Sequence, residues 1–222
     1  MNDSITIEKG DGNTESFTGG KAFVDAVAKA GSKEELRCIL NKGRITEFSE
    51  EDLEEAYRNL ALSQHWDVIQ ELFEDKDYDS CCQKLAAYGI TTSKEHFDLI
   101  NDVIATASDA ELIHEILHNT DMDATLDALH RHGYHAMTAE FLQLVHENAV
   151  HLYEDALLTE EDLAELSGQT FYERCEKSIN LMFALSTIAG LALGVSGVAD
   201  PALLIAIAGG VSLMFGRDGE AQ

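Results

Sequence analysis

The strongest constraint on the fold is a pair of uncharged stretches near the end of the chain. Residues 179–199 are 21 consecutive positions without Asp, Glu, Lys or Arg, and residues 202–216 are a further 15. The sequence Asp200-Pro201 separates them and indicates a turn. As a helix, the first stretch is about 30 Å long, which matches the apolar core of a bilayer. A helical hairpin this apolar must leave water, either for lipid or for the interior of the protein.

We expect this hairpin to enter a membrane. Arg174 and Lys177 precede it and Arg217 follows it, which favours a cytoplasmic location for both of its ends. Small residues within it permit close contact between two helices. The residues expected to form the membrane hairpin are Ile179, Phe183, Gly190, Gly194, Pro201, Ile205, Gly209 and Phe215. The alternative is a buried core hairpin of a water-soluble fold.

The acidic charge lies in the rest of the chain. The formal net charge is −26, and residues 169–222 contribute only −2 of it, with three basic residues against five acidic ones. The first 168 residues therefore carry −24 and repel phosphate, which argues against nucleic-acid binding. We expect a protein partner with a basic or apolar groove: a processing enzyme, an exporter or a regulated target. The alternative is that the charge only maintains solubility.

The composition predicts an all-α fold in three segments. Pro201 is the only proline, and Ala, Glu and Leu are abundant. We predict a flexible tail or weak strand over residues 1–19, an acidic helical body over 20–168, and the hydrophobic hairpin with a short polar tail over 169–222. The body would be cytoplasmic, and the hairpin would attach it to the membrane. None of the four cysteines forms a C-x-x-C pair, so we expect reduced cysteines that fill the core.

Three stretches of the body resemble one another: residues 40–53, 85–97 and 129–142. Each has a leucine, then a glycine, an apolar link, and a Ser or Thr that begins an acidic helical turn. The glycines expected to close helices in the left-handed conformation are Gly43, Gly89 and Gly133. The expected N-caps are Ser49, Ser93 and Thr138, which are 44 and 45 residues apart. Thr159 begins a truncated fourth copy.

These stretches predict stacked short amphipathic helices in about three repeats of roughly 45 residues. A single repeat cannot bury its own apolar stripe, so neighbouring repeats are expected to pack on each other. A helical bundle without repeats is the alternative, because it would give similar local signals.

Residues 114–118, His-Glu-Ile-Leu-His, match the zinc motif H-E-x-x-H. On a helix, His114 and His118 would share a face and hold zinc, while Glu115 would act as general base. The extended metzincin pattern is absent, since Asp121 and Ala124 stand where Gly and His are needed. We therefore expect neither catalysis nor a cofactor, with a zinc hydrolase as the remote alternative.

A second histidine cluster consists of His130, His132 and His135. Together with His114 and His118, these histidines would make a metal-binding or pH-sensitive patch. We favour a simpler interpretation, in which histidines near a helix C-terminus interact with the helix dipole and with surrounding carboxylates.

The segment from Leu157 to Gly168, LLTEEDLAELSG, resembles the C-terminal end of leader peptides in the Nif-eleven-like and nitrile-hydratase-like families. Those leaders belong to precursors of ribosomally made, enzymatically modified peptides. The stretch from Gly89 to Phe97 is similar to the Nif-eleven domain. The recognition residues implied by the resemblance are Leu158, Thr159, Leu163, Leu166 and Gly168.

The resemblance implies that residues 1–168 are a leader that docks processing or export machinery, and that residues 169–222 are a membrane-active product. Two departures are visible in the chain: Gln169 stands where a second glycine is usual, and Cys175 is the only cysteine of the implied product. A relative that keeps the tail as a permanent anchor would be a membrane-anchored, non-enzymatic adaptor or regulatory protein, which is the alternative function.

Overall fold

The computed structural model describes residues 5–8, 14–17, 20–116, 121–154, 157–194 and 200–217. Within these ranges the chain forms twelve helices and one two-stranded hairpin, which confirms the predicted all-α class. The elements are β1 Ile5–Glu8, β2 Thr14–Phe17, α1 Gly20–Ala28, α2 Lys33–Lys42, α3 Glu50–Ser63, α4 Trp66–Glu74, α5 Tyr78–Ala86, α6 Lys94–Ser108, α7 Ala110–Ile116, α8 Met122–Arg131, α9 Ala139–Glu154, α10 Glu160–Ser167, α11 Phe171–Leu193 and α12 Pro201–Arg217.

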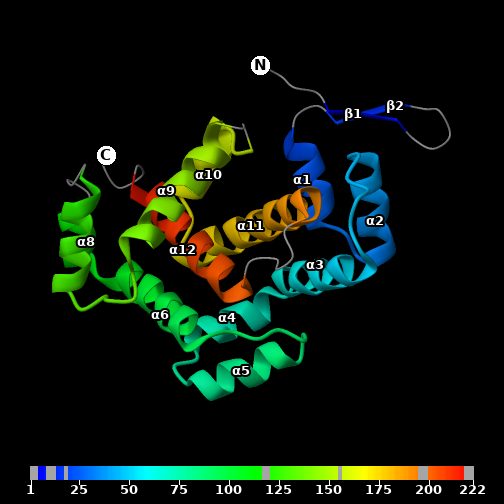
Figure 1. The fold of residues 1–222 in the computed structure, drawn as a ribbon. Coiled ribbons are helices and arrows are strands. Elements are labelled where there is room, and N and C mark those ends of the chain that lie inside the picture. Colours follow the sequence, from blue (N-terminus) through cyan, green and yellow to red (C-terminus); the bar gives the residue numbers. More distant parts are fainter. Residues whose placement is uncertain are drawn as a thin grey trace.

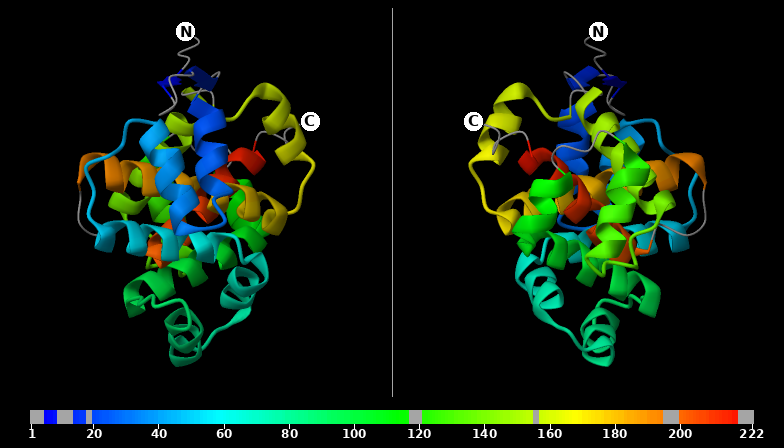
Figure 2. Two further views of the ribbon diagram at one scale, coloured as in Figure 1. Left: turned by 90° about the vertical axis from the view of Figure 1, so that its right-hand side faces the viewer. Right: turned by 90° about the vertical axis from the view of Figure 1, so that its left-hand side faces the viewer.

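The two strands form an antiparallel pair at the periphery of the molecule (Figures 1 and 2). Ile5 lies opposite Phe17, and Glu8 lies opposite Thr14. The segment 1–19, predicted as a flexible tail or a weak strand, therefore contains two short strands. They precede α1 and lie outside the helical core.

Helices α11 and α12 cross the centre of the fold (Figure 1). They pack against each other; α11 also contacts α1 and α3, and α12 contacts α6 and α9. In α12, every residue from Pro201 to Ser212 except Leu203 is buried. The Oγ atoms of Ser178 and Ser212 lie 2.9 Å apart in the interior and join the two helices. The most apolar part of the chain is therefore the core around which the rest is arranged.

The burial of α11 and α12 corresponds to the alternative prediction, in which the hairpin lies in the core of the fold and does not form a separate membrane segment. Ile179, Phe183 and Ile205 are each at most 1% exposed, and Pro201 and Gly209 are also buried. Of the other residues named for that hairpin, Phe215 and Gly190 are half-buried and Gly194 is exposed. In the part of the chain described, none of the helices has both the length and the apolarity needed to span a bilayer.

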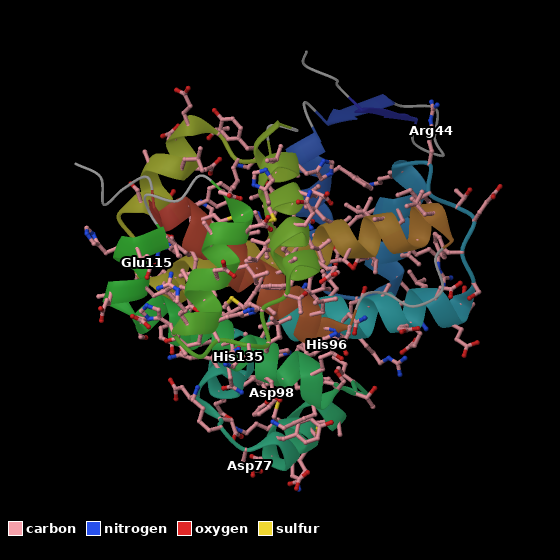
Figure 3. All side chains as sticks on the ribbon, turned by 60° about the vertical axis from the view of Figure 1, so that its left-hand side comes forward. Arg44, Asp77, His96, Asp98, Glu115 and His135 are labelled. Atoms are coloured by element: carbon pink, nitrogen blue, oxygen red, sulfur yellow. The ribbon has the colours of Figure 1, made fainter. Side chains whose placement is uncertain are left out.

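The predicted boundary at residue 168 does not separate two cores. One hydrophobic cluster runs from α1 to α12 and includes residues from both predicted segments. The physical reason is that the apolar faces of α1, α3, α6 and α9 remove α11 and α12 from water, as lipid would. A hydrogen bond reinforces the junction, because His96 Nδ1 at the start of α6 lies 2.7 Å from Asp200 Oδ2 before α12 (His96 is labelled in Figure 3).

The turns between the repeated helices share one geometry. In each turn a leucine carbonyl accepts a hydrogen bond from the backbone N–H five residues later, and the residue between them, four after the leucine, is left-handed. The bonds are Ile45 N to Leu40 O at 3.0 Å, Ile90 N to Leu85 O at 3.2 Å, and Tyr134 N to Leu129 O at 3.0 Å. The left-handed residues are Arg44, Gly89 and Gly133, with φ of 61°, 70° and 95°. The predicted helix-closing role is therefore correct for Gly89 and Gly133.

The prediction is wrong for Gly43, where φ is −76° and the next residue, Arg44, is the left-handed one. Glycine is required at position 43 for a different, steric reason. A Cβ on Gly43 would lie 2.5 Å from Phe23 Cζ, so the space beside α1 excludes a side chain.

The predicted N-caps are present at the starts of α3, α6, α9 and α10. The side chain of Ser49 accepts from Asp52 N, Ser93 from His96 N, Thr138 from Phe141 N and Thr159 from Asp162 N. The capped helices α3, α6 and α9 then pack on the central hairpin, α3 on α11 and the other two on α12. Repeat-to-repeat stacking, which we expected, is less extensive than these contacts, because the hairpin supplies the apolar surface that each repeat needs.

The left-handed turns lead to a stability prediction. Replacing exposed Arg44 by Gly should raise the free energy of unfolding by about 0.5–1 kcal/mol, since a side chain is strained at positive φ. Gly133→Ala should lower it by about 1 kcal/mol; its Cβ would meet no atom within 4 Å, so strain alone is measured. Urea unfolding of both variants checks this, and equal stability of Arg44→Gly and the parent chain would contradict it.

All four cysteines are free thiols, and they differ in burial: two are buried, Cys82 is half-buried and Cys38 is exposed. Cys81 and Cys175 are buried, and burial raises the pKa of Cys81 to about 11 and that of Cys175 to about 12. These two fill the core as predicted. Cys38 is exposed and does not.

Candidate functional site

The second histidine cluster belongs to a charge network between α7 and the end of α8. His132 Nδ1 lies 2.9 Å from Asp109 Oδ2, and its Nε2 lies 3.5 Å from Glu115 Oε2. Tyr134 Oη donates a 3.0 Å hydrogen bond to the same oxygen of Asp109. Asp109 Oδ1 accepts from the backbone N–H of Leu112, at the first turn of α7. The network therefore fastens the start of α7 to the end of α8.

Glu115, the base of the predicted zinc motif, is engaged in this network. It forms an ion pair with Arg131 and faces His132. The Arg131 hydrogen bond is the main cause that holds the pKa of Glu115 below its ordinary value, and His132 adds to it. A carboxylate paired with Arg131, and with His132 when that ring is protonated, is a poor acceptor for a proton from water.

The structure assembles the zinc motif only in part. His114 is exposed on α7, and His118 lies outside the described residues. Within the described ranges, no three His, Cys, Asp or Glu side chains are grouped so that they could hold a metal ion.

His130 and His135 lie outside the network of Asp109 and Glu115, and His135 is near Asp102, where burial raises the pKa of the carboxyl and His135 lowers it less strongly. His130 Nε2 lies 3.0 Å from the backbone oxygen of Met137 and donates to it. The ring centroids of His130 and His135 are 5.5 Å apart, and His135 is exposed (Figure 3). The expected interaction with carboxylates is thus seen for His132, the C-cap of α8, and not for His130.

Two opposite pKa shifts follow from the network. The hydrogen bond with Asp109 is the main cause that raises the pKa of His132 above its ordinary 6.5. The Leu112 N–H, followed by His132, holds the pKa of Asp109 below its ordinary 3.8. His132 therefore stabilises the fold most fully below about pH 6.5 and loses this effect as the pH rises through its raised pKa. Asp109 and Glu115 stabilise above their unfolded pKa values and lose the effect as the pH falls.

We predict that the network is complete in mildly acidic solution, between about pH 4.5 and 6.5. Part of the loss of stability between about pH 5.5 and 8.5 should disappear in His132→Gln, because that variant has no imidazolium to discharge. Exposed His146 on α9 provides the matched control variant His146→Gln. Urea unfolding at both pH values measures the effect, and equal pH dependence in His132→Gln and His146→Gln would contradict it.

The leader-like segment forms α10, and its apolar side chains face the interior. Leu158 is 7% exposed, Leu166 is 2% exposed, and Leu163 is half-buried. Thr159 caps the helix in a reciprocal capping box with Asp162. The apolar stripe that a leader helix would offer to a binding groove is therefore packed against the core of this protein. Gly168 ends α10 with φ of −89° and is exposed.

Asp162 ties α10 to two other helices. Its carboxylate lies 2.6 Å from Lys21 Nζ on α1 and 3.4 Å from Lys177 Nζ on α11. Burial, the largest single influence, raises the pKa of Asp162, but the Lys21 bond and the two Thr159 bonds together hold it well below its ordinary value. This helix is therefore held in place by charge as well as by packing.

The described chain contains an apolar pocket of about 380 Å³. This volume is within the range of small-molecule sites, roughly 300–1,000 Å³. Its wall comes mainly from α6, α7, α8, α9 and α12, with one side chain from α11 and with Asp121 and Met137 from the segments just before α8 and α9. The lining residues are Val103, Thr106, Ala107, Ile113, Ile116, Asp121, Met122, Thr125, Leu129, Met137, Phe141, Leu142, Val145, His146, Arg174, Gly210, Leu213 and Met214.

Arg174 is the only Lys or Arg among the lining residues. Its Nη1 donates a 3.2 Å hydrogen bond to Gln169 O, while its Nε is buried without a hydrogen-bond partner. None of the ion pairs formed by described residues includes Arg174. A guanidinium without a carboxylate is unexpected in a chain with 41 acidic residues.

The sequence did not indicate this pocket. Arg174 was noted only as a flank of a membrane hairpin, and the pocket was not predicted. Its wall combines helices that are separate in the chain, so no spacing rule could have indicated it. The one available signal was a basic residue followed by an apolar stretch, which suits a membrane boundary equally well.

Comparison with known proteins adds no relative. No family model matches this chain, and neither the curated proteins nor the solved structures contain a significant match. Membership of a leader-peptide family therefore stays a prediction that rests on residues 157–168 and on the weaker likeness of the repeats.

Proposed function

We propose that this protein is a non-enzymatic interaction protein whose acidic helical surface recruits a basic partner. The observation that supports this is the location of the charge. The buried polar residues in the described chain are all uncharged: Asn59, Ser63, Thr106, Ser178, Thr187 and Ser212. The carboxylates whose burial the structure describes are thus at least partly exposed, where they attract a basic surface and repel phosphate.

Seven lysines and arginines of the described chain are already paired internally with carboxylates. The lysines and arginines in ion pairs are Lys21, Lys33, Arg37, Lys84, Lys94, Arg131 and Lys177. With 15 basic residues against 41 acidic ones, a large excess of carboxylates remains without an internal counterion. A basic partner would supply those counterions.

The outer face of α9 is the contact point that we favour. Val150 and Tyr153 are the exposed large hydrophobic residues of this helix, at 37% and 53% exposure. Glu147 lies one turn before Val150 and is exposed, as are Glu160 and Glu161 at the start of α10. Exposed tyrosines are frequent anchors of protein interfaces, and acidic neighbours favour a basic partner.

A labelled amphipathic peptide of lysine and leucine provides a defined probe. Its binding to the full chain, followed by fluorescence anisotropy, should weaken as NaCl is raised, because exposed charge attraction is screened. Tyr153→Ser and the pair Glu160→Gln/Glu161→Gln should weaken it further. The control pair Glu34→Gln/Glu47→Gln removes the same charge from exposed positions far from α9 in the chain. Salt-insensitive binding, or equal effects of both pairs, would refute the proposal.

A precursor role is the second candidate, favoured by the capped acidic helix α10 with the exposed Gly168 at its end. Cleavage there would take α11 and α12 away from α1, α3, α6 and α9, so the leader would lose its core. Intact-mass measurement of the native protein tests this. A species ending at Gly168 supports cleavage, and a spectrum that contains the full-length mass alone refutes it. Membrane association through α11 and α12 likewise stays a prediction, which cell fractionation tests.

A further inference from the structure

The pocket between α6 and α12 combines an apolar wall with one unpaired cation, and we infer that it binds a single-chain amphiphile with a carboxylate head, such as a free fatty acid. This inference is independent of partner recruitment, which we assign to the outer face of α9. The apolar chain of the ligand would lie against the methionine and aliphatic side chains, and its carboxylate would meet Arg174.

The apolar part of the wall favours a flexible hydrocarbon chain. Met122 lies on α8, Met214 on α12 and Met137 in the loop between α8 and α9, and methionine adapts to irregular apolar ligands. Leu129 and Val145 add buried aliphatic surface. An apolar ligand gains about 25 cal/mol for each Å² of apolar surface that leaves water, so this wall supplies affinity without polar contacts.

Arg174 determines which head group the pocket accepts. Its Nε–H is buried without a partner, and a planar guanidinium binds a carboxylate through two parallel hydrogen bonds. One cation compensates one negative charge, which favours a monoanionic carboxylate over a phosphate in a chain of net charge −26. A neutral head would leave the Nε–H unpaired.

The other ionisable residues of the wall do not offer a second anion site. Asp121 is the N-cap of α8, and its carboxylate accepts from Asp123 N at 3.1 Å. It would repel a carboxylate placed beside it. His146 is exposed on α9. The head therefore has one favourable position, next to Arg174.

Isothermal titration of the full chain with decanoate and with decanol tests the inference, at concentrations below micelle formation. Decanoate should bind at one saturable site and more tightly than decanol. Arg174→Gln should weaken decanoate binding about tenfold or more while leaving decanol nearly unchanged, because only the charged hydrogen bonds are lost. Arg174→Lys should restore part of the affinity, since the charge returns without the planar fork.

Two further variants separate the pocket from general effects. Ala107→Phe places a ring in the pocket from α6 and should weaken both ligands. Lys29→Gln removes one positive charge at an exposed site on no wall of the pocket, and it should change neither. Circular dichroism melting confirms that each variant is folded. The inference is overturned by the absence of saturable decanoate binding, by wild-type affinity in Arg174→Gln, or by equal losses in Arg174→Gln and Lys29→Gln.

Discussion

Truncation after Gly168 is expected to unfold the remaining helices rather than to release a folded acidic body. The truncation removes thirteen apolar residues of the core, of which eight are Ile, Leu, Met, Phe or Val. Each large apolar side chain stabilises by about 1.5–3 kcal/mol when buried. For eight side chains this is about 12–24 kcal/mol, which is comparable to or larger than the roughly 5–15 kcal/mol by which a whole domain is stable. The remaining faces of α1, α3, α6 and α9 would also be exposed to water.

Trp66 provides a local probe of this loss. Its ring lies 6.0 Å from that of Phe73, and Phe73 lies 6.0 Å from Tyr172 at the start of α11. In the fragment 1–168, the emission of Trp66 should shift to longer wavelength and the near-ultraviolet circular dichroism should collapse. A chain that ends at Arg217 is the matched control and should keep both signals. Cooperative unfolding of the fragment 1–168 with the parent's near-ultraviolet spectrum would disprove the central position of the hairpin.

Side chains introduced at Gly209 and Gly210 are expected to destabilise the protein by about 2–3 kcal/mol each. Glycine in a helix interior normally costs stability, so its replacement in an open helix would be favourable. Here a Cβ on Gly209 would lie 2.8 Å from Val103 Cγ1, and a Cβ on Gly210 would lie 2.9 Å from Val145 Cγ2. These two glycines let α12 approach α6 and α9 closely.

A double-mutant cycle tests the stated cause. Gly209→Ala should be destabilising in the parent chain and nearly neutral in a Val103→Ala background, where the clashing methyl groups are gone. Gly168→Ala is the control, because the nearest atom to its Cβ would be 3.7 Å away. Urea unfolding measures all four corners of the cycle. Strictly additive effects of Gly209→Ala and Val103→Ala would show that crowding between α12 and α6 is not the cause.

The local features of the fold were predictable because they depend on neighbours in the chain. The capping boxes at Ser49 and Thr159 each involve a carboxylate three residues later, and Gly133 takes its left-handed conformation within one turn. Gly43 shows where this stops, because its missing side chain is required by Phe23, twenty residues earlier and on another helix.

The candidate site was predictable only in its parts. His132 and Glu115 were singled out, but Glu115 is paired with Arg131, sixteen residues later, and His132 with Asp109, twenty-three residues earlier. These pairings depend on how α7 packs on α8. Because of these pairings, Glu115 is an ion-paired carboxylate and not the free general base that the zinc motif suggested.

The sequence by itself determined that this chain is helical, that its charge is acidic, and that residues 179–199 and 202–216 must avoid water. It did not determine what would shield them, because lipid and a protein interior favour the same apolar side chains. Only the tertiary structure decided this, by bringing the apolar faces of α1, α3, α6 and α9 onto α11 and α12. The pocket beside Arg174 arises at the same place, because its wall exists only where those helices meet.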